Sequence, residues 1–406
     1  MGGPGRLFIV TPGLYDRHSH PYGEARGWRD ACRHRGIASH FYINRRADPA
    51  IIAEYAATPA FTYATDVILD RNPATREQSD FINVSQQFAR DCGVLEEAGV
   101  GASDVVVVTY ASERDLHGAA IWLERIPVER RPAVAFIFHV PDFSWRVDPQ
   151  RRRVDGDFSR VRQAMDRLRA VLPTAKVIVL ATTERLASLL RTILQHPCDT
   201  AAAPTYFVDP RILESTDARV SGRTTVLVAG EYRHEKGSDL VVPVILRLAA
   251  ARPGIKFAVQ VYSKKVATTV HHELAPMAGS PSQCRIDYGQ LPHEIYQKRL
   301  LLSDILLLPY RWWRYAMRAS GVFSEAAGLG IVTVVPDRTW MSDMLAAGSG
   351  AGTVFAEPTV DSITAAVTAA LDTYPALKAR AESRAAEWRR VNSVGAVLDS
   401  ILRRAG

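Results

Sequence analysis

The chain has 406 residues, of which 47% are hydrophobic and 23% charged, and its formal net charge is +7. Because this length exceeds the size at which a single core stops growing, we expect two domains. The composition is that of a globular protein, without a run of about 18 to 20 apolar residues to cross a bilayer and without a signal peptide at the amino terminus. We therefore expect a cytoplasmic protein.

The cysteines and the basic residues exclude further classes of protein. Cys32, Cys92, Cys198 and Cys284 are scattered without metal-ligand spacing, which indicates reduced thiols. The arginines, dense at residues 151–153, favour a solvated surface, with attraction to anionic lipid or a phosphorylated substrate as the alternative. Peripheral contact with the inner membrane face thus stays open. We expect no nucleic-acid partner, because aromatic residues are not interleaved with the arginines.

Strand-like apolar runs alternate with helical patterns along the first half of the chain. Strands are expected at residues 7–10, 38–43, 66–69, 104–109, 133–138 and 176–180, and helices at 24–35, 78–98, 112–125, 157–171 and 184–195. This alternation indicates βαβ units and a mainly parallel sheet.

A second alternating series follows an interruption at residues 197–223, which predicts a crossing between domains. Its strands are expected at 224–229, 256–262, 284–288, 304–308, 331–335 and 353–355. The sequence therefore predicts an α/β protein with two Rossmann-like domains facing one another. The expected divisions are an N-terminal domain at 1–205, a linker at 206–223, a C-terminal domain at 224–378 and a helical tail at 379–406 that packs back on the N-terminal domain.

Two cations lie in the loop between the strand at 224–229 and the helix predicted from residue 238. Residues 230–237 read Gly-Glu-Tyr-Arg-His-Glu-Lys-Gly, so that Arg233 and Lys236 follow the carboxyl end of a strand, where open α/β sheets bind ligands. Cations at a helix start oppose the helix dipole by about 0.3–1 kcal/mol, and a bound diphosphate would reverse that sign. We therefore interpret the two cations as phosphate ligands rather than as solvated side chains.

A glycine-containing helix start at residues 318–330 offers a second device for holding phosphate. Ser320 can cap the helix, and Gly321 lets backbone N–H groups approach a ligand closely. Glu325 falls about one and a half turns later, near enough to reach a ribose diol. Alone this pattern is equally typical of a capped, buried helix, but with two cations on the same domain it predicts a nucleotide diphosphate site.

The C-terminal half resembles the donor-binding domain of the GT-B-fold, retaining glycosyltransferases that use nucleotide sugars (group 1, or family 4 type). Three patterns within residues 224–345 carry the resemblance: a Gly…Arg…Lys-Gly loop, a Tyr…Ser-Asp…Pro segment, and a Gly-containing helix start that ends in glutamate. The matching residues are Gly230, Arg233, Lys236, Gly237, Tyr296, Ser303, Asp304, Pro309, Gly321 and Glu325. The resemblance implies a nucleoside diphosphate sugar as donor, no cofactor, no metal and retention of configuration.

One position departs from the family's pattern. The family has two glutamates eight positions apart, whereas the residue eight before Glu325 is Met317. A thioether is only a weak acceptor, so the resemblance implies a different recognition of the donor sugar, with Arg318 or Ser320 as substitutes. A subgroup that reads Pro-Tyr…Tyr…Arg-x-Ser-Gly is also similar to this chain. The donor-binding residues implied are Tyr310, Arg318, Ser320, Gly321, Val322 and Glu325.

His139 follows the strand expected at 133–138, and the family places a histidine near the reacting sugar after an equivalent strand. The alternative, a strand-end histidine bonded only to backbone, stays open. The loop at 13–23 resembles the family's first glycine-rich loop, where donor and acceptor meet. Its candidates are Gly13, His18, His20 and Gly23. A metal site at Asp16, His18 and His20 is disfavoured, because the spacing suits neither a structural nor a catalytic cluster.

The sequence thus predicts a glycosyltransferase that transfers a sugar from a nucleoside diphosphate sugar to a glycan, a lipid-linked acceptor or a small molecule. Its predicted catalytic residues are Arg233 and Lys236, which would neutralise the departing diphosphate, and His139, which would orient the donor sugar or acceptor hydroxyl. One alternative is an epimerase of the same fold, for which the sequence indicates no acid/base carboxylates. The other is a non-catalytic nucleotide-sugar-binding protein, which Met317 favours.

Overall fold

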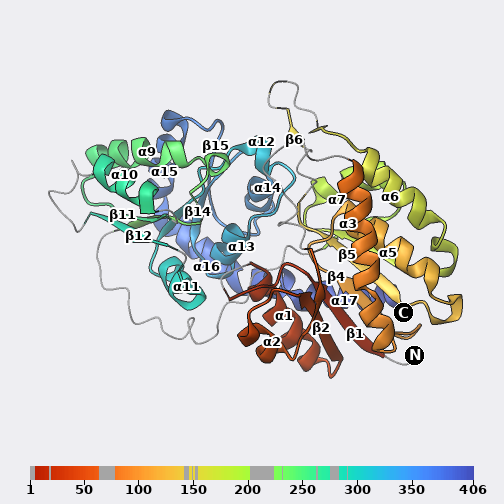
Figure 1. Cartoon of the computed structure of the whole chain (residues 1–406). Helices are drawn as coiled ribbons and strands as arrows, with labels where there is room; N and C mark the ends of the chain where they lie inside the picture. The colour runs from red at the N-terminus through yellow and green to blue at the C-terminus, as the bar shows by residue number, and fades with distance from the viewer. Residues whose placement is uncertain are drawn as a thin grey trace. The chain divides into compact units, whose positions relative to one another are not determined.

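The computed structural model of the chain describes residues 5–17, 20–63, 78–140, 146–148, 150, 154–201, 224–230, 232–261, 264–274, 283–289 and 291–406. The chain divides into two compact units (Figure 1). The first consists of Met1–Pro204 and Ser393–Gly406, and the second of Thr205–Asn392. The predicted linker at 206–223 and the predicted strand at 66–69 lie outside the described residues.

The first unit is built on a seven-stranded parallel sheet with the order β3-β2-β1-β4-β5-β8-β9. Its strands are β1 (Arg6–Thr11), β2 (Ala38–Asn44), β3 (Thr58–Phe61), β4 (Val105–Val108), β5 (Ala133–Phe138), β8 (Val177–Ala181) and β9 (Cys198–Thr200). A short antiparallel pair, β6 (Arg146–Val147) and β7 (Val154–Asp155), stands apart from this sheet. The strand order reverses between β1 and β4, which creates a switch point at the carboxyl ends of these strands.

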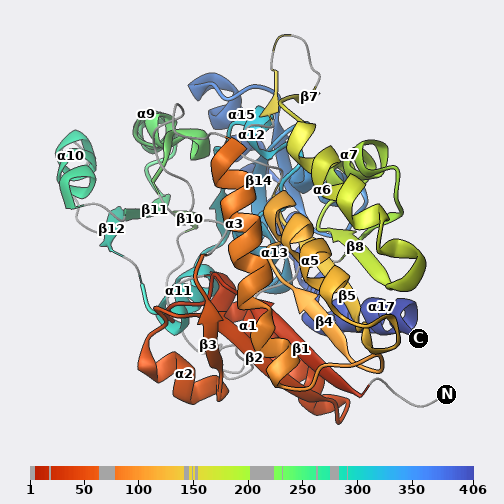
Figure 2. The same ribbon diagram turned by 45° about the vertical axis from the view of Figure 1, so that its right-hand side comes forward.

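Helices cover both faces of this sheet. They are α1 (His20–His34), α2 (Pro49–Tyr55), α3 (Gln78–Asp91), α4 (Gly93–Glu97), α5 (Glu113–Arg125), α6 (Ser159–Arg169), α7 (Glu184–Leu194) and α17 (Val394–Ala405), with short 3-10 turns η2 (Val128–Arg130) and η3 (Leu172–Thr174). On one face, α1 and α17 share a core with alternate residues of β1 and β4, as the two-residue period of a strand requires. The other face carries α3 and α5 side by side (Figures 1 and 2).

The second unit is built on a six-stranded parallel sheet with the order β12-β11-β10-β13-β14-β15. Its strands are β10 (Thr225–Val228), β11 (Lys256–Val261), β12 (Cys284–Tyr288), β13 (Ile305–Leu307), β14 (Val332–Pro336) and β15 (Gly352–Phe355). Its helices are η5 (His234–Lys236), α9 (Ser238–Ala251), α10 (Lys264–Leu274), α11 (His293–Leu301), α12 (Trp312–Tyr315), α13 (Gly321–Gly328), α14 (Trp340–Ala346), α15 (Val360–Asp372) and α16 (Tyr374–Val391). Here the order reverses between β10 and β13.

The predicted α/β class with two parallel sheets is confirmed. The sequence did not predict β3 and β9, because β3 contains Pro59 and β9 has only three residues, features that place a strand at the edge of a sheet. The expected tail helix is two helices, of which α16 belongs to the second unit and α17 to the first. None of the described helices is long and apolar enough to cross a membrane.

Candidate functional site

In the second unit, the loop after β10 turns at Gly230. This residue has a φ of 103°, which favours glycine, and its N–H donates to the Gln260 Oε1 atom at 3.2 Å. A Cβ at this position would stand 3.3 Å from Lys236 Nζ, 3.8 Å from Val322 Cγ2 and 4.0 Å from the Tyr310 hydroxyl. Three segments therefore meet at the carboxyl end of β10: η5, the loop after β13 and the start of α13.

The η5 turn that carries Lys236 is fixed on the loop after β13. Gly237 ends this turn in the left-handed conformation, with a φ of 70°, and a Cβ there would lie 1.9 Å from the Pro309 carbonyl oxygen. The Arg311 N–H also donates to the Glu235 carbonyl at 3.0 Å. The close approach at Gly237 requires a residue without a side chain, so the glycine that follows Lys236 sets where the lysine stands.

The cations predicted from the sequence, Arg233, Lys236 and Arg318, lie in this region together with Arg314. Lys236 Nζ lies 5.8 Å from the centre of the Tyr310 ring, within the range of a cation–π contact. Arg233 is exposed, whereas Arg318 is half-buried. Burial lowers the pKa of Arg318; repulsion from Arg314 and Arg233 acts in the same direction, and Tyr315 and Glu235 act against it. Positive charges that lie together in a partly buried site are stabilised when an anion binds there.

The start of α13 adds backbone donors to these cations. The Ser320 Oγ atom caps the helix by accepting from the Phe323 N–H at 3.2 Å. Gly321 and Val322 form the first turn, whose N–H groups have no acceptor within the helix and favour an anion. We call Gly230, Arg233, Lys236, Tyr310, Arg318 and the α13 start at residues 320–322 the nucleotide cluster, after the ligand that the sequence predicts for them.

Glu325 lies one turn farther along α13 and is buried, with an exposed fraction of 3%. Burial raises its pKa to about 8, and a hydrogen bond with Tyr296 of α11 lowers the pKa in part. The carboxyl is therefore mostly protonated at neutral pH. A protonated carboxyl can both donate and accept hydrogen bonds, which suits the two hydroxyls of a ribose.

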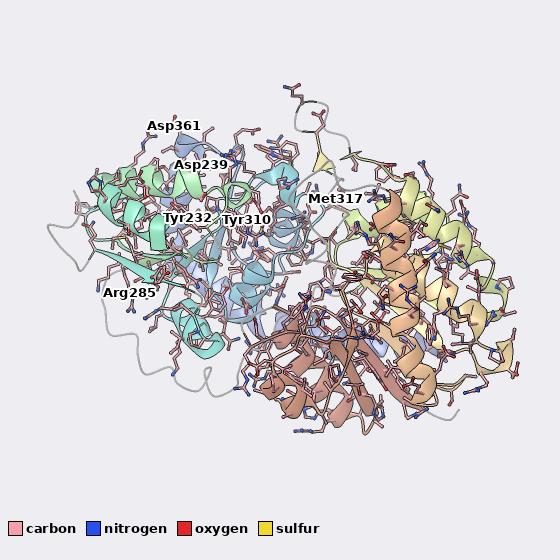
Figure 3. The ribbon with its side chains drawn as sticks, viewed as in Figure 1. Tyr232, Asp239, Arg285, Tyr310, Met317 and Asp361 are labelled. Atoms are coloured by element: carbon pink, nitrogen blue, oxygen red, sulfur yellow. The ribbon has the colours of Figure 1, made fainter. Side chains whose placement is uncertain are left out.

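Met317 occupies the segment that joins α12 to α13, as Figure 3 shows together with Tyr310. The residue is buried, with an exposed fraction of 6%. A buried thioether is an apolar neighbour with little hydrogen-bonding capacity. This position therefore carries an apolar side chain where the resembling family has a carboxylate.

In the first unit, His139 follows β5 and is buried. Its ring stacks on that of Tyr110, which follows β4, with ring centres 4.0 Å apart and an angle of 13° between the planes. Tyr110 has a φ of 52°, an uncommon conformation for a bulky residue that is often found at functional sites. The His139 Nε2 atom lies 3.7 Å from the Oε2 atom of Glu24 on α1.

Glu24 is buried against the same ring pair, with an exposed fraction of 2%. Burial raises its pKa to about 7, and hydrogen bonds from Trp28 and Tyr110 act in the opposite direction. The bond from Trp28 Nε1 to Glu24 Oε1 measures 3.2 Å. The three side chains of Glu24, Tyr110 and His139 thus come from segments that follow β1, β4 and β5, around the switch point of this sheet.

The predicted loop at 13–23 is shorter than expected, because α1 begins at His20. Gly23 therefore lies inside a helix rather than in a loop, a correction that Pro21 explains, since proline is tolerated in the first helical turn. Gly13 is in the loop, and a Cβ there would stand 3.2 Å from Pro21 Cγ. His18 and the side chain of His20 lie outside the described residues.

Glu24 and Tyr110 are site candidates that the sequence patterns did not indicate. The sequence pattern at Glu24 predicts only the start of a helix, although the residue directly follows the candidate Gly23. Tyr110 stands just after a buried strand, at the same edge as His139, and that position was the available signal. Within the described part of the chain, no group of three or more His, Cys, Asp or Glu side chains is placed to hold a metal ion.

Comparison with known proteins supports the fold rather than a particular reaction. No protein-family model matches the chain, and neither does any curated protein sequence. The structure is similar to a UDP-forming α,α-trehalose-phosphate synthase from Burkholderia xenovorans, with a TM-score of 0.67 and 12% identity over 99% of this chain and 98% of that one. It is also similar to HepE of Anabaena in complex with UDP, with a TM-score of 0.63 and 10% identity over 98% of each chain.

Sucrose-phosphate synthase from Thermosynechococcus elongatus matches with a TM-score of 0.61 and 13% identity over 98% of each chain. Identities this low show a common fold and leave donor and acceptor open. Each structural match nevertheless covers nearly the whole of this chain and nearly the whole of the compared protein. The chain therefore has the GT-B fold, with two Rossmann-like units, that these proteins share.

Proposed function

We propose that the protein is a glycosyltransferase that transfers a sugar from a nucleoside diphosphate sugar to an acceptor. The observation that carries this proposal is the meeting of Lys236, Tyr310 and Val322 around Gly230 at the carboxyl end of β10. Arg233, Arg318 and the α13 start supply further positive charge to a diphosphate, and Glu325 supplies a carboxyl for the ribose.

In this proposal the charge on the departing diphosphate is neutralised by side chains and helix N–H groups, so that transfer needs neither a metal ion nor a cofactor. Each charge-assisted contact contributes on the order of 1.5–3 kcal/mol. His139 orients the donor sugar or the acceptor hydroxyl. Retention of the anomeric configuration is the stereochemical outcome proposed from the family resemblance, and the NMR coupling constant of the product's anomeric proton reports it.

The acceptor is a glycan, a lipid-linked sugar or a small molecule, and the place of action is the cytoplasm, with peripheral contact at the inner membrane face. The Arg-rich composition and the net charge of +7 support such contact. Co-sedimentation with vesicles of anionic and of neutral lipid checks it. Binding to the anionic vesicles alone, weakened by salt, is the expected result.

A second candidate function is epimerisation of the donor sugar, which needs an acid/base carboxylate that the sequence did not indicate. The buried Glu24, with a pKa raised by burial to about 7, is such a group. Inversion at C2 of the donor sugar without transfer, followed by NMR, would favour this function.

The proposed transfer is tested by offering the purified protein a panel of UDP-, GDP- and ADP-sugars with glycan, lipid-linked and small-molecule acceptors. We expect one donor to release free nucleoside diphosphate in step with a glycosylated product. Lys236→Ala should lose this activity, whereas the control Arg247→Ala, in an exposed pair with Asp361, should keep it. Nucleotide binding without turnover of any donor would instead indicate a non-catalytic binding protein, which the buried Met317 would explain.

A further inference from the structure

The first unit holds a buried carboxyl against a buried imidazole. Glu24 Oε2 and His139 Nε2 are 3.7 Å apart, and the exposed fractions of the two residues are 2% and 8%. This distance is too long for a hydrogen bond but close enough for ion pairing. In a dry environment, a charge on either group changes the proton affinity of the other.

Both partners are held in place by neighbours from other segments. The His139 ring lies flat on Tyr110, and its backbone carbonyl accepts from the Thr182 hydroxyl at 3.4 Å. On the other side, the Trp28 indole N–H donates to Glu24 Oε1 at 3.2 Å. Neighbouring residues thus hold the carboxyl and the imidazole in their facing orientation, whereas exposed side chains would be free to change rotamer.

The Glu24–His139 pair lies at the edge of the sheet where a ligand is expected to bind. Glu24 lies on the helix after β1 and His139 directly after β5, on either side of the β1–β4 switch point where sheets of this kind bind ligands. Trp28 and Thr182 do not change charge near neutral pH. Among the described residues, the printed contacts join the titratable groups Glu24, His139 and Tyr110, the last of which faces the pair from the end of β4.

We propose that Glu24 is a positioning residue for His139: its carboxylate, 3.7 Å from Nε2, keeps the imidazole turned toward α1 and favours the protonated ring through its charge. Glu24 thereby fixes both the orientation and the protonation state in which His139 meets the sugar or the acceptor. The part His139 plays in the reaction rests on the proposed function, whereas the coupling between the two side chains does not.

The coupling is measured by NMR titration of the His139 ring in the full-length protein and in Glu24→Gln. Glutamine has nearly the same shape and can still accept from Trp28, but it carries no negative charge. We expect the protonation constant of His139 to fall roughly threefold or more in this variant, because the ring loses its anionic partner. Asp30→Asn, on the same helix and half-buried, is the matched control and should leave the titration unchanged.

Activity gives the second measurement. With the donor identified, Glu24→Gln should lower kcat by about tenfold or more and change its pH profile. The affinity for UDP should stay within about twofold, since the nucleotide cluster belongs to the second unit. Glu24→Asp, which restores the charge, should recover part of kcat. If Glu24 only filled space, the shorter aspartate would give no such recovery.

An unchanged His139 titration in Glu24→Gln would overturn the inference, even if the wild-type protein proves to be a glycosyltransferase. The proposed function and the Glu24–His139 coupling can also fail separately in the other direction. A shifted His139 titration in a protein that turns over none of the donors would refute the proposed function and leave the coupling standing.

Discussion

The Nζ atom of Lys236 lies 3.3 Å from the point that a Cβ on Gly230 would occupy. Gly230 therefore does two things at once: it turns the chain through a positive φ, and it leaves room for an ammonium group directly over the end of β10. This arrangement places the lysine where the charge of a diphosphate would lie in a sheet of this type.

Replacing Gly230 with alanine should weaken both the fold and nucleotide binding. A φ of 103° costs an alanine on the order of 1–3 kcal/mol, and the new methyl group would displace Lys236. We expect a lower melting temperature and a higher Kd for the nucleoside diphosphate, measured by thermal unfolding and calorimetry. Gly254→Ala, where no atom lies within 4 Å of the added Cβ, is the control in the same unit. Equal affinities in the two variants would contradict the geometry.

Glu325 should make the ligand-free protein less stable as the pH rises. Its folded pKa of about 8 lies above the ordinary 4.5, so the folded state keeps a proton that the unfolded state has lost. The stabilising effect is complete below about pH 4.5 and is lost progressively up to about pH 8. Glu325→Gln lacks this dependence and should be more stable than wild type at pH 8, by on the order of a few kcal/mol.

Denaturant unfolding of both proteins at pH 5 and pH 8 checks this expectation. Exposed Glu273→Gln serves as the control and should follow the wild type at both values. A difference between wild type and Glu325→Gln that stays constant with pH would show that the buried carboxyl does not hold its proton.

The contact between α3 and α5 should not accept a side chain at Gly118. A Cβ there would lie 2.5 Å from the Ser85 carbonyl oxygen and 2.9 Å from Phe88 Cδ1. Gly118→Ala should destabilise the protein by about 1–3 kcal/mol, although alanine is the better helix former by up to about 1 kcal/mol. Circular dichroism should show the drop in melting temperature, and Gly93→Ala, in open space, should show none. A melting temperature for Gly118→Ala at or above that of wild type would mean that the helices separate at little cost.

The sequence predicted those parts of the fold and site that short stretches of chain encode. Runs such as residues 104–109 and 133–138 are buried on both faces of a parallel sheet, and they identify β4 and β5 without further information. The cations of the nucleotide cluster were found for the same reason, because each stands at a fixed offset from a strand or a helix start.

Contacts between distant segments could not be predicted in this way. The pairing of Glu24 with His139 depends on the strand order that brings the segments after β1 and β5 to one edge. The edge strands β3 and β9 were missed because one contains Pro59 and the other has only three residues, so that pairing with a neighbouring strand decides their place. Both the Glu24–His139 pair and the edge strands depend on contacts between distant segments, which a local sequence pattern does not encode.

The most direct test of the nucleotide cluster is calorimetric titration of wild type, Lys236→Ala and Arg247→Ala with UDP, or with the diphosphate of the preferred donor, and with the corresponding nucleoside. The account predicts that Lys236→Ala raises the Kd for the diphosphate by about 10- to 100-fold, equivalent to one charge-assisted contact, and leaves the weak nucleoside affinity unchanged. Arg247→Ala should bind both ligands as wild type does. Unaltered diphosphate affinity in Lys236→Ala would contradict the account.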